Sequence, residues 1–502
     1  MSFLSDEHSL YFVYCFVLIL AFSLFYLYCH HKLTYWQRRG VPHLKDTNII
    51  FGDFKNAILF RTAPAFHLGE IHRKSPANAP YVGFYIFHKP CLLLKDPELI
   101  KQILVRDFNI FPNRHFAGPQ QKDSIGMINL FGLKNPAWRY LRKKISPTLS
   151  KSKLRQMVPL MIETGEPMMK HLKENVDNGK GRVLDAQDIN YKYTADLIAN
   201  IGLGTKTDSF RYSDSDYSKN LMSFFNSFKR MVALVTVFFM PELVAVIGSP
   251  ILFDLNFVKK IFWDAVESRE KSGDKRGDYI DSIIMLKNGE QNSIYRLEGD
   301  NLFYQSGIFF SGFESSSTLS AFTLMELAKN REYQDYARED MKSAIDKFGW
   351  TIEAFNKMKY LDQCIAETVR LHPPISTVDR YALQDYKIPH SDVVIEKGTP
   401  IFISLYGMHG DPDFFDEPHV FNPDRFADDQ VISNAYLPFG AGPRKCIGMK
   451  VGIMHVKVVL SMILSEFEVY QKQIQESKLD PRSTFTAAAH GIHLEFTKIM
   501  KK

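Results

Sequence analysis

A single cysteine lies among glycines in the stretch Phe439-Gly440-Ala441-Gly442-Pro443-Arg444-Lys445-Cys446-Ile447-Gly448. A thiolate that binds a metal must be deprotonated, and nearby cations or backbone amides favour that form. Gly440 and Gly442 allow a tight backbone turn beneath a flat cofactor, where a Cβ would collide. Gly448 lets the amides at the start of the following helix turn toward the sulfur. The stretch therefore predicts a metal-binding thiolate; an inert buried cysteine is the alternative.

Composition and charge narrow the class of protein. The 502 residues are 45% hydrophobic, which is ample for a large core, and no internal repeat or low-complexity linker divides them. The net charge of +6 is modest and the basic residues form no dense stripe, so no nucleic-acid partner is expected. The 5 cysteines are too scattered for a disulfide framework. No Gly-x-Gly-x-x-Gly or phosphate-binding loop occurs, so electrons for redox chemistry must come from another protein.

Residues 10–29 are uncharged and almost wholly apolar. A helix of this length spans about 30 Å, the thickness of the hydrocarbon core of a bilayer. Lys32, Arg38 and Arg39 follow the segment, which places its C-terminal side in the cytosol. An acidic start and the lack of a small-residue cleavage site favour an anchor over a cleaved signal peptide. We expect a short lumenal N-terminus at 1–9, a transmembrane anchor at 10–29, a basic, proline-containing linker at 30–45 and one large domain at 46–502.

A second apolar stretch covers 232–253 and contains Pro241, Glu242, Gly248 and Pro250. A membrane-spanning helix tolerates such breaks poorly. Short apolar pieces bounded by prolines indicate a surface loop that dips into lipid. Packing in the protein core is the alternative, because short apolar runs do not distinguish the two.

Residues 301–329 have the pattern of one long helix, interrupted at Ser311-Gly312-Phe313-Glu314-Ser315-Ser316. A glycine followed by several hydroxyl residues forms helix poorly and invites a local bulge. Gly312 would let the backbone approach a bound diatomic molecule, while Glu314 and Ser315 supply an acid and a hydroxyl for proton transfer. The alternative is a kink with ordinary serines.

These two segments resemble the cysteine-ligand loop and the oxygen groove of the cytochrome P-450 superfamily, the haem-thiolate monooxygenases. Two residues depart from the usual groove, because Ser311 stands where Ala or Gly is usual and Ser315 where Thr is usual. Serine keeps the hydroxyl but lacks the restricted χ1 of threonine, so we expect looser proton delivery. The resemblance covers essentially the whole chain. It implies a mainly α fold with a small β region, an N-terminal transmembrane helix and a haem-binding catalytic domain over 46–502.

The resemblance also implies roles for residues around haem b, iron protoporphyrin IX. Cys446 would be the thiolate ligand of the iron, with Glu314 and Ser315 as the proton relay. Arg444 is a fixed cation suited to a haem propionate. The other residues implied at the cofactor are Trp138, Arg142, Arg380, Phe439 and Gly448.

Glu367 and Arg370 stand three residues apart on a predicted helix, and by themselves they indicate an exposed ion pair of little effect. In the resembled family such a pair is buried and joined by an arginine from a downstream meander, which 421–426 matches with Arg425. The resemblance thus implies a structural ion cluster that fixes the core and takes no part in chemistry.

The substrate pocket is expected to draw on several segments that are mostly apolar or aromatic, so a lipophilic ligand is favoured. The expected residues are His115, Phe309, Phe310, Phe313, Ser376, Thr377, Val378, Phe485 and Thr486. They do not identify the ligand.

Finer details, such as the run from Pro147 to Leu154, resemble insect microsomal enzymes of the family-six type. This implies oxidation of lipophilic foreign compounds, such as plant toxins and insecticides, by O₂ at the cytosolic face of the endoplasmic reticulum membrane. The implied electron donor is NADPH–cytochrome P-450 reductase, with cytochrome b5 as a second donor. Basic residues on the thiolate side would attract an acidic donor, although a merely solvated face is the alternative. They are Arg139, Lys143, Lys144, Lys445 and Lys450.

Two other functions stay open. One is a haem-thiolate isomerase or dehydratase that works without reductase; such relatives often lose the acid–hydroxyl pair, which this chain keeps in Glu314 and Ser315. The other is a non-catalytic membrane haem carrier or gas sensor, which needs neither that pair nor a wide apolar pocket. NADPH consumption in the presence of reductase and a lipophilic substrate separates the three.

Overall fold

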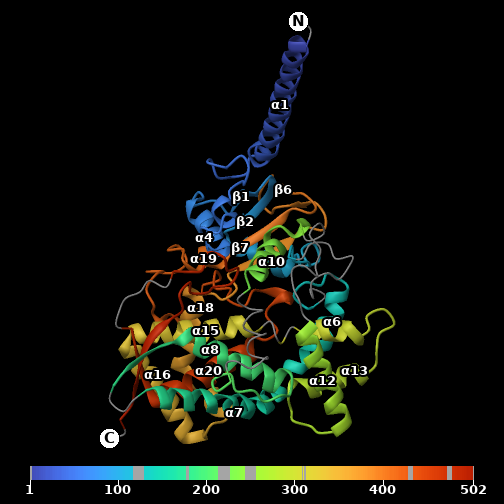
Figure 1. The fold of residues 1–502 in the computed structure, drawn as a ribbon. Helices are drawn as coiled ribbons and strands as arrows, with labels where there is room; N and C mark the ends of the chain where they lie inside the picture. Colours follow the sequence, from blue (N-terminus) through green and yellow to red (C-terminus); the bar gives the residue numbers. More distant parts are fainter. Residues whose placement is uncertain are drawn as a thin grey trace.

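The computed structural model describes residues 3–116, 129–176, 180–212, 227–243, 256–307, 309, 312–427, 433–471 and 478–500, and the side chains of all of these except 3–10 and 313. Across these ranges the chain is mostly helical, and its strands form three small sheets (Figure 1). The predicted mainly α fold with a small β region is confirmed.

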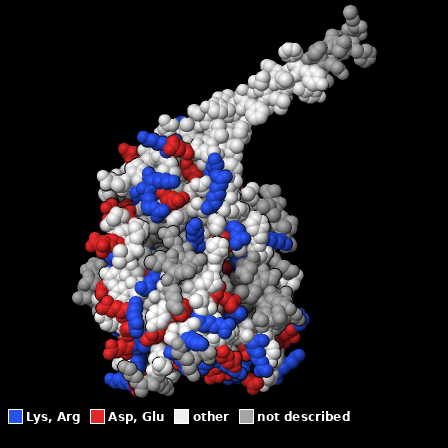
Figure 2. All heavy atoms as spheres, turned by 60° about the vertical axis from the view of Figure 1, so that its left-hand side comes forward, with Lys and Arg blue, Asp and Glu red and all other residues white. Residues whose placement is uncertain are grey.

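The N-terminal helix α1 (Phe3–Leu33) projects away from the rest of the molecule, as Figure 1 shows. Its stretch Tyr11–Leu33 is long and apolar enough to cross a membrane, with a mean hydropathy of 2.3, and hardly any of it is buried. Figure 2 shows no acidic or basic side chain between the grey tip of this helix and its base, whereas both charges are mixed over the visible face of the body. The helix predicted at 10–29 is present and extends further at both ends.

A four-stranded sheet lies at the base of α1, in the order β1-β2-β7-β4. Its strands are β1 (Tyr81–Ile86), β2 (Lys89–Leu94), β7 (Pro400–Ser404) and β4 (Thr377–Tyr381). β2 and β7 run parallel, and the other two pairs are antiparallel, with Arg380 opposite Ile401. Every residue of β1 and β7 is buried, which explains why their sequences are largely apolar instead of alternating.

Two smaller antiparallel sheets complete the β region. One has the order β3-β9-β8 and the other pairs β5 with β6. The strands are β3 (Arg182–Asp185), β5 (Tyr386–Lys387), β6 (Val394–Ile395), β8 (Phe467–Tyr470) and β9 (His493–Lys498).

The helical body is built around α15 (Gly312–Lys329) and α20 (Met449–Glu466), which contact each other, α7 (Lys151–Asn175) and α8 (Ala186–Leu197). Ser320 and Thr323 of α15 are fully buried, and their hydroxyls donate to backbone carbonyls one turn earlier, so these two hydroxyls keep a partner inside the core. α20 is buried over Met454–Leu464. Although α20 is also apolar and long enough to cross a membrane, it is a core helix.

The other helices surround these elements or connect them. They are α2 (Tyr35–Arg38), α3 (Lys55–Ile58), α4 (Pro64–Lys74), α5 (Pro97–Lys101), α6 (Ala137–Ile145), α10 (Phe228–Phe239), α12 (Asn256–Ser272), α13 (Tyr279–Asn288), α14 (Gly299–Ser306), α16 (Arg331–Phe348), α17 (Ile352–Phe355), α18 (Lys359–Leu371) and α19 (Leu405–His409). Short 3₁₀ or π segments are η1 (Gln102–Arg106), η2 (Ser146–Leu149), η3 (Ile198–Gly202), η4 (Pro423–Phe426) and η5 (Gly442–Arg444).

The long helix predicted at 301–329 is interrupted earlier than expected. α14 ends at Ser306 and α15 begins at Gly312, so the hydroxyl residues that follow Gly312 are helical. Ser315 and Ser317 donate to carbonyls three residues earlier, at 3.2 Å each, and this satisfies the hydroxyls without breaking the helix. Ser311 lies outside the described residues.

The prediction that 232–253 dips into lipid is wrong for its first part. Phe238 and Phe239 of α10 are 3% and 1% exposed. Phe239 stacks on Phe402 of β7 with ring centroids 6.0 Å apart, and Phe238 contacts Phe485 at the same distance. The apolar side chains at the C-terminal end of α10 therefore pack in the core and not in lipid. Residues 244–253 lie outside the described part of the chain.

Candidate active site

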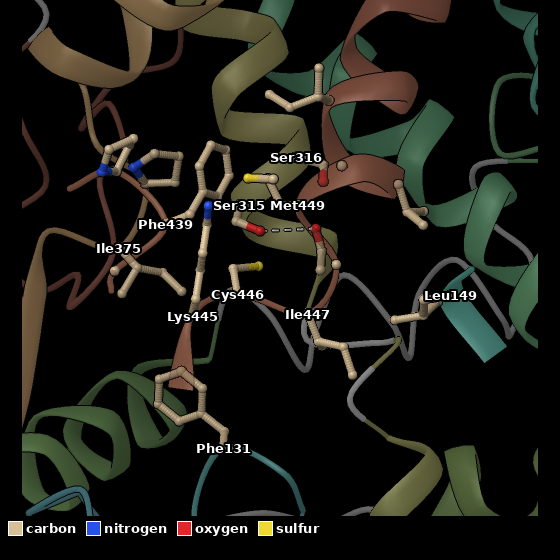
Figure 3. Close-up of a pocket in the computed structure, with 18 of the residues that line it drawn as sticks. Phe131, Leu149, Ser315, Ser316, Ile375, Phe439, Lys445, Cys446, Ile447 and Met449 are labelled. Atoms are coloured by element: carbon tan, nitrogen blue, oxygen red, sulfur yellow. Dashed lines mark hydrogen bonds between the residues drawn. The ribbon is translucent and has the colours of Figure 1, made fainter. Parts of the chain in front are cut away.

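A cavity of about 250 Å³ lies between α15, α6, β4 and the loop that carries Cys446 at the start of α20. In Figure 3, Cys446 and Ser315 face the same space from two different elements, with Phe439 and Ile447 on either side of the cysteine. The cavity is lined mainly by apolar side chains, with a few polar groups among them. Such a lining is typical of a pocket for a cofactor or a lipophilic ligand.

Backbone hydrogen bonds close the Cys446 loop. The N–H of Cys446 donates to the carbonyl of Phe439 at 2.9 Å. Gly440 and Gly442 have φ angles of 69° and 68°, the left-handed conformation that glycine adopts without steric cost. A Cβ on Gly442 would lie 2.1 Å from the carbonyl oxygen of Leu104. The tight turn expected from these glycines is present.

The thiol of Cys446 is accessible from the cavity, but protein atoms surround it closely. This burial raises the pKa of Cys446. The N–H groups of Gly448 and Met449, at the start of α20, and the guanidinium of Arg142 oppose the burial and favour the thiolate. A bound metal cation would add to these effects, so the sulfur is placed to act as an anionic ligand.

The cavity carries a surplus of positive charge. Arg114, Arg142, Arg380 and Arg444 line it, and among the described residues no Asp or Glu does. Asp379 lies behind the wall, 3.3 Å from the guanidinium of Arg114. Burial lowers the pKa of Arg380 to about 9 and that of Arg444 to about 8. Buried cations in this excess call for an anionic occupant.

Arg444 and Trp138 hold each other in place. The guanidinium of Arg444 lies 4.3 Å from the centre of the Trp138 ring, and it donates to the carbonyls of Pro112 and Leu133 at 2.6 and 2.8 Å. Trp138 and Arg142 stand four residues apart on α6, and both line the cavity. These contacts fix the orientation of the cationic wall before any ligand binds.

The residues fit haem b. Within the described chain, Nε of Arg380 and Nη1 of Arg444 are buried without a hydrogen-bond partner, which suits the carboxylates of two propionates. A Cβ on Gly440 or Gly448 would meet no protein atom within 4 Å, so glycine leaves room for a flat macrocycle there. No described group of three or more His, Cys, Asp or Glu side chains could hold a metal directly. A porphyrin iron with one cysteine ligand matches this donor set.

α15 forms the wall opposite the Cys446 loop. Gly312, Ser315 and Ser316 line the cavity, and the Ser315 hydroxyl donates to the carbonyl of Gly312 at 3.2 Å, the contact dashed in Figure 3. Glu314, the other half of the predicted relay, is not among the lining residues. Its carboxylate is bound by Arg230 of α10.

The residues predicted for the substrate pocket divide into two groups. Phe309, Thr377 and Val378 line the cavity. Four others lie in the core behind the lining or beside it: His115, Ser376, Phe485 and Thr486. Phe310 and the side chain of Phe313 lie outside the described part of the structure.

The three residues of the predicted ion cluster meet in the core. Arg370 and Glu367 are fully buried and form two hydrogen bonds of 2.7 Å each. Arg425 approaches Glu367 at 3.4 Å from η4. Arg370 also donates to the carbonyls of His409 and Pro418 at 2.9 and 2.6 Å, so it joins α18 to the segment after α19. The reading of an exposed surface pair is therefore excluded.

Sequence reasoning missed two parts of the cavity. Arg114 lines it, lies over the ring of Phe131 at 4.1 Å and contacts Asp379. The only signal in the sequence was a single arginine between Asn113 and His115, which is weak. An apolar wall from α7, α8 and η3 was also missed, because its residues look like ordinary core positions: Met161, Leu197, Ile198 and Ile201.

Comparison with known proteins gives consistent results. A family model described as Cytochrome P450 matches residues 42–496. Over 94% of its length the chain is 35% identical to cytochrome P450 6k1 of Blattella germanica, of which 94% is covered. It is 33% identical to probable cytochrome P450 6g2 of Drosophila melanogaster, over 96% of this chain and 98% of that protein. It is 31% identical to cytochrome P450 6a2 of the same species, over 97% of this chain and 100% of that protein.

Proposed function

The chain belongs to the cytochrome P450 family, and from this premise we propose that Cys446 is the residue that would bind its haem iron as a thiolate. Membership makes the protein a haem-b-binding oxidoreductase of the monooxygenase type. One observation supports the assignment of the ligand most directly. The Cys446 sulfur faces a cavity in which, among the described residues, Arg380 and Arg444 each keep a buried N–H without a partner, and backbone amides and Arg142 favour its thiolate form.

Haem bound at a thiolate supplies binding and reductive activation of O₂, so that one oxygen atom enters the substrate and the other leaves as water. The chain holds the group in place. Trp138, Arg142, Arg380 and Arg444 would bind and orient its carboxylates, Gly440 and Gly448 would leave room for the ring, and Phe439 would pack beside it.

Ser315 would pass protons toward the cavity, because its hydroxyl is the first on α15 after Gly312 that lines the space opposite Cys446. Glu314 would transfer a proton to Ser315 to replace the one that Ser315 has passed on. The carboxylate of Glu314 must first separate from Arg230 to do so, since the ion pair holds it outside the cavity lining.

The substrate would be a lipophilic compound. Phe309, Ile375 and Val378 line the cavity with apolar side chains. Similarity to insect proteins of the family-six type supports metabolism of foreign compounds such as plant toxins or insecticides. The arrangement favours orientation by shape rather than by many hydrogen bonds.

Electrons would come from NADPH–cytochrome P-450 reductase, with cytochrome b5 as an additional donor. Four cations on the thiolate side are exposed and can meet an acidic partner: Arg139, Lys143, Lys445 and Lys450. The apolar helix α1 would anchor the protein in the endoplasmic reticulum membrane, with 1–9 in the lumen, 30–45 at the interface and 46–502 in the cytosol.

A spectrum of the reduced, CO-bound protein tests this assignment. We expect an absorption band near about 450 nm, because a thiolate donates strongly, and about 420 nm for a neutral ligand. Cys446→Ser should abolish the 450 nm band, while Cys364→Ser, a buried cysteine of α18 outside the cavity, should retain it. NADPH consumption and product from 7-ethoxycoumarin with reductase then test the monooxygenase reaction. A 450 nm band that survives in Cys446→Ser would overturn the ligand assignment, and product formed without reductase would favour an isomerase.

A further inference from the structure

Thr486 lies behind the cavity wall and is 3% exposed. Its hydroxyl donates to the carbonyl of Pro373 at 2.6 Å and lies 2.7 Å from the hydroxyl of Tyr406. Because the single hydroxyl hydrogen of Thr486 is used on Pro373, Tyr406 must donate to Thr486. The backbone N–H of Thr486 donates to the carbonyl of Pro374 at 3.0 Å. Every polar group of this residue is therefore turned toward neighbouring elements.

The carbonyl of Thr486 completes the arrangement. It accepts a hydrogen bond of 3.3 Å from the hydroxyl of Thr318 on α15. Thr318 is 3% exposed and stands one helical turn after Ser315. A single residue thus connects α15 to the segment that begins with Pro373.

The connected elements all contribute to the cavity. α15 supplies Ser315 and Leu319, and the segment after α18 supplies Pro374, Ile375 and Thr377. Leu405, beside Tyr406 in α19, lines the cavity as well. The hydrogen bonds at Thr486 join these walls to one another, and a gap opened between them would lose close packing contacts.

We propose that Thr486 is a positioning residue that holds α15 and the Pro373–Thr377 segment at the separation the substrate needs. The proposal rests on the monooxygenase function above and adds a residue that lies outside the cavity lining. Loss of the hydroxyl would leave the Pro373 carbonyl and the Tyr406 hydroxyl without their partner in a buried place. The segment would then relax and displace the Thr486 carbonyl, which binds Thr318 of α15 one turn after Ser315.

The same turn offers a matched control. Thr484 is 5% exposed, and in the described structure its hydroxyl has no hydrogen-bond partner. Thr484→Val and Thr486→Val therefore remove the same atom at two buried positions, but only the second breaks bonds between elements. Thr486→Ser keeps the hydroxyl and should restore the arrangement.

The test uses the full-length, haem-loaded protein in lipid nanodiscs, with 7-ethoxycoumarin as the probe. Amide hydrogen exchange over 313–320 should be about ten-fold faster in Thr486→Val than in the parent. The lost buried hydrogen bonds should shift the local opening equilibrium by about that factor. Thr484→Val and Thr486→Ser should exchange like the parent. Thr486→Val should also bind the probe more weakly in the haem spectral titration and form less product per NADPH.

The proposal would be overturned if amides at 313–320 exchanged at the same rate in Thr486→Val and Thr484→Val, whether or not that rate differed from the rate in the parent. If Thr486→Val does not fold, Tyr406→Phe replaces it, because it removes the donor to Thr486 and keeps the ring; exchange at the parent rate in that variant would likewise overturn the proposal. The monooxygenase function fails separately, if the parent protein itself forms no NADPH-dependent product while the exchange difference persists.

Discussion

Arg230 of α10 binds the carboxylate of Glu314 of α15 through two hydrogen bonds, Nη1 to Oε1 at 3.0 Å and Nη2 to Oε2 at 2.6 Å. The two side chains are only 10% and 16% exposed, so water screens the pair weakly. The pair joins α10 to α15 and turns the acid away from the cavity, whereas the next residue, Ser315, lines it. Glu314 can therefore act as a proton donor, as a tether for α10, or as both.

Glu314→Gln separates these roles. Glutamine keeps the shape and an oxygen acceptor for Arg230, but it cannot release a proton. If Glu314 recharges Ser315, the variant should keep its haem but form less product and more hydrogen peroxide per NADPH, since a positioned acid contributes about 10²–10⁴-fold to the step it serves. Glu339→Gln, at an exposed acid of α16, serves as the control. Unchanged coupling in Glu314→Gln would leave the residue only its role as a tether.

Ser315→Ala tests the hydroxyl of the relay itself. The variant should bind haem and substrate normally, because among the described residues the Ser315 hydroxyl bonds only a carbonyl of its own helix. Electrons should be diverted to form hydrogen peroxide. Loss of the donor should slow proton delivery by about 10²–10⁴-fold, and ordered water would restore part of that rate. Ser315→Thr should couple as well as the parent or better, because β-branching restricts the hydroxyl to fewer rotamers. If the parent, Ser315→Ala and Ser315→Thr formed equal amounts of product per NADPH, the proton relay would be assigned to Ser316 instead, which lines the cavity one residue later.

The sequence predicted those site residues whose neighbours in the chain define their environment. The glycines around Cys446 require a turn wherever the loop lies, and Trp138 and Arg142 share a helix face by spacing alone. The partner of Glu314 could not be predicted, because Arg230 lies 84 positions away and only packing of α10 brings it near. The same holds for Thr486, whose spacing from Thr318 is 168 residues. The apolar run of α10 was misread because lipid and an aromatic core select the same side chains.

Arg370→Ala should abolish folded, haem-loaded protein. Arg370 is fully buried, pairs with Glu367 and binds the backbone carbonyls of His409 and Pro418, so its loss strands a buried carboxylate and costs about 3–5 kcal/mol. Yield of the 450 nm species and resistance to protease measure the effect. Arg425→Ala should cost less, because Arg425 contacts Glu367 only at 3.4 Å and is partly exposed. Stable, haem-replete but inactive Arg370→Ala protein would contradict a structural role.

Neutralising the exposed cations on the thiolate side should weaken reductase binding. Lys143→Gln combined with Lys450→Gln should raise the apparent KM for reductase and flatten its dependence on salt, because exposed charges act over a Debye length of about 10 Å. Lys144→Gln should have a smaller effect, since the Lys144 ammonium already donates to the carbonyl of Glu290 at 3.1 Å. If the double variant showed unchanged kinetics with reductase, these cations would have no role in reductase binding and would be ordinary solvated surface residues.

The junction between the membrane helix and the catalytic body depends on Trp36 and Gly83. Trp36 is 1% exposed, and its ring lies directly on the backbone of Gly83 in β1, where an added Cβ would come within 2.4 Å of it. The Trp36 indole donates to the carbonyl of Phe84 at 3.3 Å, and its backbone N–H donates to the Tyr85 hydroxyl at 3.0 Å. The segment after α1 is thus packed into the sheet and does not hang as a free linker.

Gly83→Ala should push the ring out of this site and destabilise the protein by about 1–3 kcal/mol, as overpacking of a core does. Loss of the 450 nm species on heating in detergent measures the change. The same substitution in a Trp36→Ala background should be nearly neutral, because the methyl group then enters space that the ring has left. The stability effects of the two substitutions are therefore expected to be strongly non-additive, as is usual for residues in contact. Additive effects would mean that Gly83 is required for the strand itself and not for the attachment of the membrane helix.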